Sequence, residues 1–255
     1  MIARFALQLV CGMSLMWLLL PRAQISSGFF RIQMLVTLGL SVLAALMAEG
    51  LTETHRVVLS ERAAVSLAVA LAIASFLGSV MWTLERRRAG AFFAATVLAL
   101  SAAPLIFAAG PMSAWRTALG SLHILSQLSS ASMLGGAVTG MLLGHWYLTA
   151  TTMSIDPLRR ITIYYGIAGL VRIVLSAVAL WLGWHALSDT TQLAWLALRW
   201  LAGVFGPLVV VAMVLRILRY RNTQSATGVL FVGVILTFIG EATAALLYRE
   251  LSIPF

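Results

Sequence analysis

The sequence predicts an all-α, polytopic integral membrane protein, built as a helical bundle of about eight transmembrane helices. Of its 255 residues, 61% are hydrophobic and only 10% are charged, and the mean hydropathy is +0.99. A soluble domain carries about 25% charged residues, because it must present a polar shell to water. This chain has too few polar residues to build such a shell, so most of its surface must face lipid.

Eight segments have the roughly 20 apolar residues that a helix needs to cross the hydrocarbon layer. In chain order they are residues 3–20, 32–49, 63–83, 90–109, 121–148, 161–183, 195–217 and 226–248. Short connections such as "TLERRRAG" and "RYRNTQSATG" join them and leave no room for a soluble domain. Backbone groups in lipid must be hydrogen-bonded within the protein, which favours helices for segments of this length. We therefore expect a single transmembrane domain over residues 1–255.

The first segment follows Arg4 and has the apolar run of a secretion signal. No small-residue cleavage pattern comes after it, because the chain continues as "WLLLPRAQ" with a proline and an arginine. We therefore expect a retained transmembrane helix.

The basic residues predict the orientation of the helices. All 17 are arginines. The loops after the first, third, fifth and seventh segments hold ten: Arg22, Arg31, Arg86, Arg87, Arg88, Arg159, Arg160, Arg216, Arg219 and Arg221. The opposite side holds five: Arg4, Arg56, Arg62, Arg116 and Arg249. Because basic residues are retained in the cytoplasm, this difference predicts that both termini face outward. Anchoring arginines also account for the net charge of +9 without a nucleic-acid partner.

The fifth segment is the least lipid-like of the eight. Ser132, Gly136, Gly140 and Gly144 recur every four residues, so they form one stripe along the helix. A stripe of small residues lets a neighbouring backbone approach closely. We expect this helix to lie inside the bundle, with Gly140 against a neighbour.

Two histidines mark the ends of the fifth segment. His145 precedes Trp146 and Tyr147, which is typical of a residue at the membrane interface; the alternatives are a quinone contact or a haem ligand. His123 lies 22 residues earlier, or about 33 Å along a helix, so the two cannot share a metal. No metal centre is predicted from the chain's four histidines and one cysteine.

Three ionisable residues lie inside predicted spans, and such residues indicate function by default. Glu241 and Arg199 have similar depths, so we expect them to form an ion pair, whereas Arg172 has no assigned partner. Glu49 ends the second segment and His123 begins the fifth on the same side of the membrane. Four polar groups from four helices would then converge.

Such a group could bind a quinone headgroup. Quinone chemistry requires a hydrogen-bond donor for the carbonyl oxygens and a group that exchanges protons. By residue type, Glu241 is the candidate catalytic proton carrier, and His123, Arg199, Glu49 and His145 are candidate quinone contacts. The alternative is a structural ion pair that fixes the packing of the helices.

Three short stretches carry a resemblance to a known family. They are "LFVGVILTFIGEATAALLYRE", "GGAVTGMLLGHWYL" and "LRWLAGVFGPLVVV". With the eight-span layout, they resemble the membrane anchor subunit of dimethyl sulfoxide reductase and the related polysulfide-reductase-type anchors. The resemblance implies outward termini, no resident cofactor, and electron transfer between quinol and an iron–sulfur partner.

The leading hypothesis is a quinone-interacting membrane anchor subunit of a multi-subunit respiratory oxidoreductase in the bacterial inner membrane. It would pass electrons between menaquinone or ubiquinone and an iron–sulfur or cytochrome partner, and would contact lipid and the other subunits. Whether the chain is itself reactive or only an anchor stays open. The alternatives are a secondary transporter or channel-like subunit, a b-type haem subunit and a purely structural subunit.

The charge distribution makes a testable prediction about topology. A reporter that is active only in the periplasm should be active when it is fused to either terminus, because the arginine-rich loops stay in the cytoplasm. Activity of a cytoplasm-specific reporter at the C-terminus would contradict this orientation.

Overall fold

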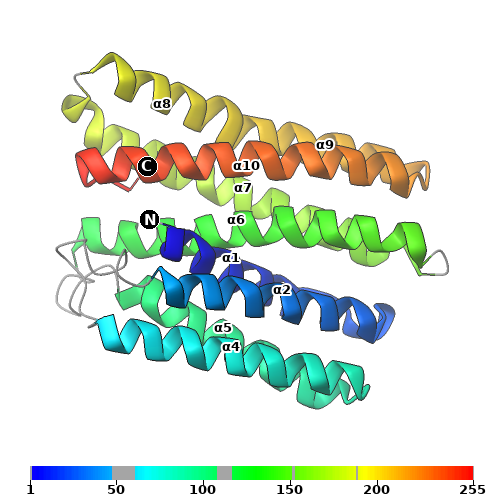
Figure 1. Cartoon of the computed structure of the whole chain (residues 1–255). Coiled ribbons are helices and arrows are strands. Elements are labelled where there is room, and N and C mark those ends of the chain that lie inside the picture. Colours follow the sequence, from blue (N-terminus) through cyan, green and yellow to red (C-terminus); the bar gives the residue numbers. More distant parts are fainter. Residues whose placement is uncertain (1, 48–60, 108–116, 151–152, 188, 255) are drawn as a thin grey trace. The chain divides into compact units, whose positions relative to one another are not determined.

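The computed structural model describes residues 2–47, 61–107, 117–150, 153–187 and 189–254 (Figure 1). Within these ranges the chain consists of helices and short turns, with no strand. The described part of each of the eight predicted segments coincides with one helix or with a continuous run of helices. The all-α class predicted from the sequence is confirmed.

The chain divides into two compact units, Met1–Gly135 and Gly136–Phe255. The following helices begin in the first unit: α1 (Ile2–Leu19), α2 (Ser27–Leu46), α4 (Glu61–Thr83), α5 (Arg87–Phe107) and α6 (Ala118–Thr149). The second unit contains the end of α6 and then α7 (Asp156–Gly183), α8 (Thr190–Trp200), the π-helix η4 (Leu201–Phe205), α9 (Gly206–Arg219) and α10 (Thr223–Leu251). Two 3₁₀ turns, η1 (Arg22–Gln24) and η3 (Trp184–Ala186), follow α1 and α7.

Seven helical segments within the described ranges are long and apolar enough to cross a membrane, so the chain is a multi-pass membrane protein. One of the seven is the continuous run of α8, η4 and α9. Helix α6 is the longest helix at 32 residues but is not among the seven. Its serines, glutamine and histidines lower its hydropathy, in agreement with the expectation that the fifth segment is the least lipid-like.

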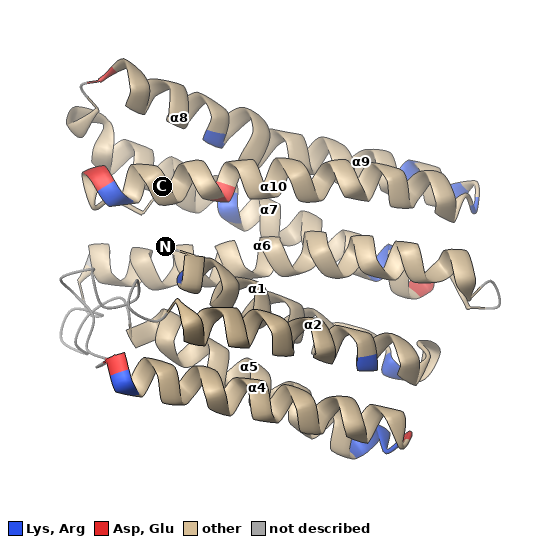
Figure 2. Cartoon of the chain, viewed as in Figure 1, with Lys and Arg blue, Asp and Glu red and all other residues tan. Residues whose placement is uncertain are grey.

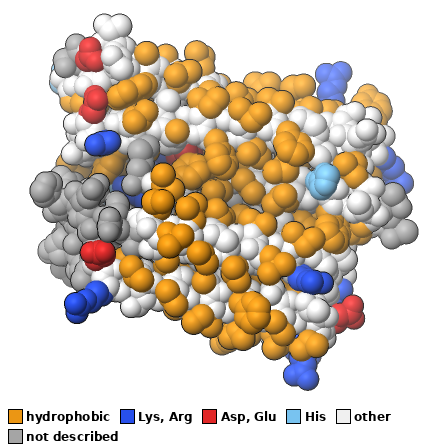
Figure 3. Space-filling model, viewed as in Figure 1, with side chains coloured by type: hydrophobic (Ala, Val, Ile, Leu, Met, Phe, Trp, Pro, Cys, Tyr) orange, Lys and Arg blue, Asp and Glu red, His pale blue; other side chains and the backbone are white. Residues whose placement is uncertain are grey.

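The helix surfaces have the composition that lipid contact requires. Large apolar side chains such as Leu46, Phe92 and Val174 are exposed along the middle of their helices or at their ends. Hydrophobic side chains cover much of the face shown in Figure 3. Figure 2 shows most charged residues near the ends of helices, with a small group inside α7, α8 and α10. That group is the exception to the membrane pattern and is the candidate site.

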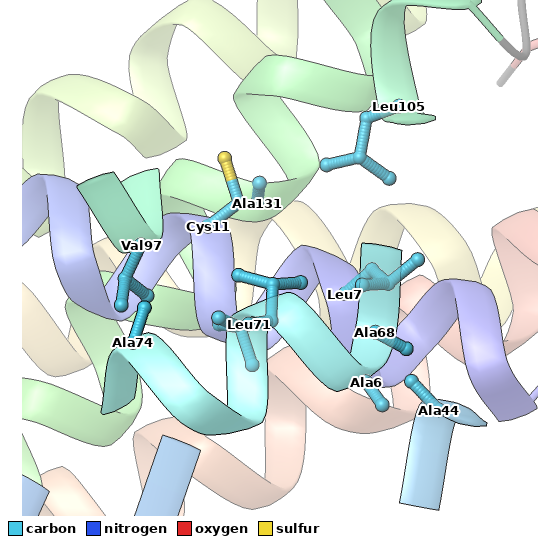
Figure 4. Packing of buried hydrophobic residues seen from close by; sticks show 11 residues of the cluster. Ala6, Leu7, Cys11, Ala44, Ala68, Leu71, Ala74, Val97, Leu105 and Ala131 are labelled. Carbon is cyan, nitrogen blue, oxygen red and sulfur yellow. The ribbon is translucent and has the colours of Figure 1, made fainter. Parts of the chain in front are cut away.

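In the first unit, small side chains let the helices pack closely. The core cluster joins α1, α2, α4, α5 and α6 (Figure 4). Its members are Ala6, Leu7, Val10, Cys11, Ala44, Ala68, Leu71, Ala74, Val97, Leu105 and Ala131. The closest approach is between backbones: a Cβ atom on Gly12 would lie 1.7 Å from the carbonyl oxygen of Ala131. Only glycine permits α1 and α6 to meet there.

Two arginine-bearing turns meet at one end of the first unit. The Arg87 guanidinium donates a hydrogen bond of 2.7 Å to the backbone carbonyl of Arg22. This contact joins the turn after α1 to the turn after α4. Both turns belong to the side that the sequence assigns to the cytoplasm.

In the second unit, α10 packs against α8, η4 and α9, while α7 packs against α9. Here the closest contact is between two glycines. A Cβ atom on Gly240 of α10 would lie 2.0 Å from the Cα atom of Gly203 in η4. This backbone contact lies beside the candidate site, because Glu241 follows Gly240 directly.

The glycine stripe of α6 packs less tightly than the sequence predicts at Gly140. A Cβ atom there would meet Leu230 at 3.7 Å and Ile161 at 3.8 Å, which are ordinary van der Waals distances. Gly144 is tighter, since its Cβ would lie 2.6 Å from the hydroxyl oxygen of Thr227. The stripe therefore faces neighbouring helices as expected, but Gly140 is not the point of closest approach.

These contacts predict different responses to added methyl groups. Gly203→Ala and Gly240→Ala should each lower the free energy of unfolding by about 3 kcal/mol, because a methyl group would overlap the facing backbone. Gly228→Ala lies on the same helix as Gly240, but its Cβ would meet no atom of the described residues within 4 Å. It is the matched control and should not lower stability. Thermal unfolding in detergent measures the difference. Equal stability of Gly240→Ala and Gly228→Ala would contradict the backbone contact.

Candidate functional site

Three charged side chains meet inside the second unit and form the cluster Arg172–Glu241–Arg199. Arg172 donates to Glu241 through Nε (3.3 Å to Oε1) and Nη2 (3.1 Å to Oε2). Arg199 donates through Nη1 to Oε1 of the same carboxylate at 3.0 Å. The relative exposures are 2% for Arg172, 0% for Arg199 and 4% for Glu241. The carboxylate is therefore shared between two guanidinium groups, away from solvent.

Each of the three helices contributes to the cluster from its own position. On α7, Arg172 and Ser176 are four residues apart and so lie on one face, and the Ser176 hydroxyl accepts a hydrogen bond of 3.3 Å from Arg199 Nη2. Arg199 lies in the last turn of α8, directly before the π-helix. Glu241 lies within α10.

The glycines of the close contact also make room for Arg199. A Cβ atom on Gly203 would lie 2.8 Å from Arg199 Nη1, as well as 2.5 Å from the Cα of Gly240. A larger residue would displace either the guanidinium or α10. Gly203 therefore contributes both to the helix contact and to the space for the ion pair.

The π-helix has a local cause. Pro207 has no N–H group and its ring crowds the carbonyl four residues earlier, at Gly203, so a regular α-helix is disfavoured there. The chain adopts the wider π turn over Leu201–Phe205 instead. Such turns often occur at functional sites, because they reorient the side chains on either side.

The charge of the cluster is unbalanced, since two guanidinium groups share one carboxylate. Isolated charges are costly to bury, and a buried pair is tolerated only when its geometry and hydrogen bonds are good. Both guanidinium groups donate to the same Glu241 carboxylate. Arg199 Nε is buried and has no hydrogen-bond partner among the described residues. Arg199 therefore has one N–H donor, at Nε, that no described residue accepts.

A tyrosine extends the polar contact between α7 and α10. The Tyr165 hydroxyl lies 2.6 Å from the hydroxyl of Thr237 and 3.2 Å from the backbone carbonyl of Gly233. Thr237 is four residues before Glu241 and Tyr165 is seven before Arg172, so each pair follows one helix face. Sequence reasoning missed Tyr165, Thr237 and Ser176. The signal that could have found them is their spacing of four or seven residues from Arg172 or Glu241, which puts them on the same helix faces.

A second polar cluster lies in the first unit, between α1 and α6. Arg4 donates to the Gln127 side-chain oxygen at 2.9 Å, and the same oxygen accepts from Gln8 at 2.8 Å. Arg4 Nη2 lies 3.1 Å from His123 Nε2. Because a guanidinium can only donate, Nε2 is the acceptor and the ring proton belongs on Nδ1. This network gives the Arg4 guanidinium polar partners within the first unit.

The predicted site residues have different outcomes. The Glu241–Arg199 ion pair is confirmed, and Arg172, for which no partner was predicted, joins it. His123 belongs to the first-unit cluster with Arg4, and haem ligation through its Nε2 would require that contact to break. Glu49 lies outside the described residues. His145 is exposed near the end of α6, as expected at an interface.

The cluster makes a prediction about stability. Glu241→Gln should lower the free energy of unfolding by about 3–5 kcal/mol, because both guanidinium groups lose their shared anion while they stay buried. The control is Glu250→Gln on the same helix, where an exposed carboxylate contacts Gln192 and the expected loss is below about 1 kcal/mol. Thermal unfolding of both variants tests this. An unchanged melting temperature for Glu241→Gln would contradict the buried pair.

Comparison with known proteins adds no assignment to this geometry. No family model matches the chain, and neither does any curated protein or any solved structure. Among the described residues, no three histidine, cysteine or acidic side chains are grouped as metal ligands. The buried cluster Arg172–Glu241–Arg199 is therefore the feature on which a functional conclusion must rest.

Proposed function

We propose that this chain is a quinone-interacting membrane subunit of a multi-subunit respiratory oxidoreductase in the bacterial inner membrane. The observation that supports it best is the cluster Arg172–Glu241–Arg199, which holds fixed hydrogen-bond donors and excess positive charge among membrane-spanning helices. A quinone is soluble in the membrane and carries carbonyl oxygens that accept hydrogen bonds. Menaquinone and ubiquinone both have this chemistry.

The charge of the cluster suits quinone reduction. A quinone oxygen gains negative charge as electrons arrive, and a nearby guanidinium stabilises that charge more strongly in an apolar interior than in water. In the proposal, Glu241 holds the two guanidinium groups in place and keeps the net charge of the cluster near +1. Its role as a proton carrier stays a prediction, because both of its oxygens accept hydrogen bonds from arginine.

The electrons would come from a partner subunit. An iron–sulfur cluster is usually held by four cysteines, and this chain has one, Cys11. In the proposal, an iron–sulfur or cytochrome subunit exchanges electrons with the quinone, while this chain binds the headgroup and the surrounding lipid. The resemblance of three sequence stretches to quinone-reactive anchors agrees with this role.

A secondary transporter is the second candidate, and the broken helix favours it. Transporters bind their substrates where a membrane helix is interrupted. Here η4 and Pro207 interrupt the seventh span immediately after Arg199. The substrate would be an anion that Arg199 recognises.

Binding of a short-chain quinone tests the proposal. The protein, purified with any subunits that accompany it, should bind the quinone, and Arg199→Lys should weaken binding by about tenfold, because lysine cannot reproduce the fixed guanidinium donors. The exposed Arg216 on the same span provides the control variant Arg216→Lys, which should bind normally. Isothermal titration in lipid nanodiscs measures both.

Two results would count against the quinone proposal. One is the absence of quinone binding by the wild-type protein. The other is uptake of a small anion by liposomes that contain the wild-type protein but not by those that contain Arg199→Lys, which would establish the transporter instead.

A further inference from the structure

An arginine patch lies at one end of the first unit, where α1 and α4 end and where α2 and α5 begin (Figure 2). Helix α1 packs against α2 and α5, and these two helices also pack against α4. The hydrogen bond of 2.7 Å from Arg87 to the backbone carbonyl of Arg22 holds the two turns together. The members of the patch come from these turns and from the first two turns of α2 and α5: Arg22, Arg31, Arg86, Arg87 and Arg88.

The arginine patch has almost no acidic counterpart. Glu85 is the one acidic residue in the segments 20–31 and 83–90, which form this end of the unit. Within the described residues, the ion pairs that involve arginine belong to the cluster Arg172–Glu241–Arg199. Arg22 is half-buried, and the other four arginines of the patch are exposed. The patch therefore offers guanidinium donors to an anion from outside the protein.

The backbone adds to the positive potential of the patch. Helices α2 and α5 begin here, with Ser27 and Arg87 as their first residues. The first N–H groups of a helix have no partner within the helix, and together they act as about half a positive charge. Two such helix ends beside five guanidinium groups favour an anion with several acceptor oxygens, such as a phosphate group.

Exposed apolar side chains continue from the patch along the same helices. Leu35 is four residues after Arg31 on α2, and Phe92 is four residues after Arg88 on α5, so each shares a helix face with an arginine. Leu35 is 44% exposed and Phe92 is 67% exposed. A free anion makes no use of such a surface, whereas a phospholipid carries acyl chains next to its phosphate. The sequence of charge and then apolar surface therefore matches a lipid.

We infer that the arginine patch binds the headgroup phosphate of an acidic phospholipid such as phosphatidylglycerol, with acyl chains against the faces that carry Leu35 and Phe92. Clusters of basic residues beside membrane helices attract anionic lipids, and a guanidinium group can donate two parallel N–H bonds to a phosphate. Phosphatidylcholine also carries a phosphate, but its quaternary ammonium is repelled by the arginines. The inference goes beyond the proposed function and does not depend on quinone binding.

Native mass spectrometry of the full chain in detergent, with any accompanying subunits, tests this site. Dioleoylphosphatidylglycerol should bind the wild type more tightly than dioleoylphosphatidylcholine. Arg86→Gln/Arg88→Gln should weaken binding of the phosphatidylglycerol by about tenfold, because two of the five charges are lost. This variant keeps the hydrogen bond from Arg87 to Arg22, so the two turns stay together.

Two matched variants serve as controls. Arg86→Lys/Arg88→Lys keeps the charge and should retain most of the phosphatidylglycerol affinity. Arg62→Gln/Arg249→Gln removes the same amount of charge from exposed positions outside the patch and should bind like the wild type. All replaced side chains are exposed, so the melting temperatures in lipid-free detergent should be equal, and weaker binding would not reflect unfolding.

Three results would overturn the inference. Equal phosphatidylglycerol affinity of the wild type and Arg86→Gln/Arg88→Gln would exclude the arginine patch as the lipid site. Inorganic phosphate that binds the wild type as tightly as phosphatidylglycerol would identify a site for a free anion. Loss of a co-purifying subunit from Arg86→Gln/Arg88→Gln, with unchanged phosphatidylglycerol affinity, would identify a protein interface.

Discussion

The carboxylate of Glu241 is shared by two guanidinium groups, and the arrangement of α7, α8 and α10 depends on keeping it so. A charge in a membrane interior is tolerated only with a partner at hydrogen-bond distance, and each of the three helices supplies one member. None of these helices can slide or rotate without separating a buried charge from its counter-ion. The ion cluster therefore fixes the relative position of three helices whose apolar surfaces alone would permit several.

Local features of the second unit follow from this constraint. Gly203 and Gly240 bring η4 and α10 into backbone contact, and Gly203 also leaves space for the Arg199 guanidinium. Pro207 disfavours regular helix at the same level, and the π turn that results lies immediately after Arg199. The hydrogen bond between the Tyr165 and Thr237 hydroxyls adds a second polar contact between α7 and α10, on the N-terminal side of Arg172 and Glu241. The close helix packing, the π turn and the buried ion pairs therefore all lie within about two helical turns of one another.

The same two turns of α7 and α8 have an outer surface of a different kind. Toward the interior they present Ser176 and Arg199, whereas Ala177 and Trp200 line a hollow at the surface. The first-unit cluster around Arg4 and His123 is already internally hydrogen-bonded, so it offers a weaker argument for a ligand.

The sequence alone determined the membrane character, the positions of the long helices and the pairing of Glu241 with Arg199. Hydropathy fixes which residues cross the membrane, and distance from a span's end fixes depth. The sequence could not assign a partner to Arg172. The depth of a residue in the membrane does not say toward which neighbour its helix face points, and only the packed structure shows that Arg172 on α7 faces α10. The sequence correctly predicted that the stripe containing Gly140 faces neighbouring helices. The closest contacts, however, occur at Gly12 and Gly203, because each of these glycines faces the backbone of another helix, which no spacing pattern in the sequence indicates.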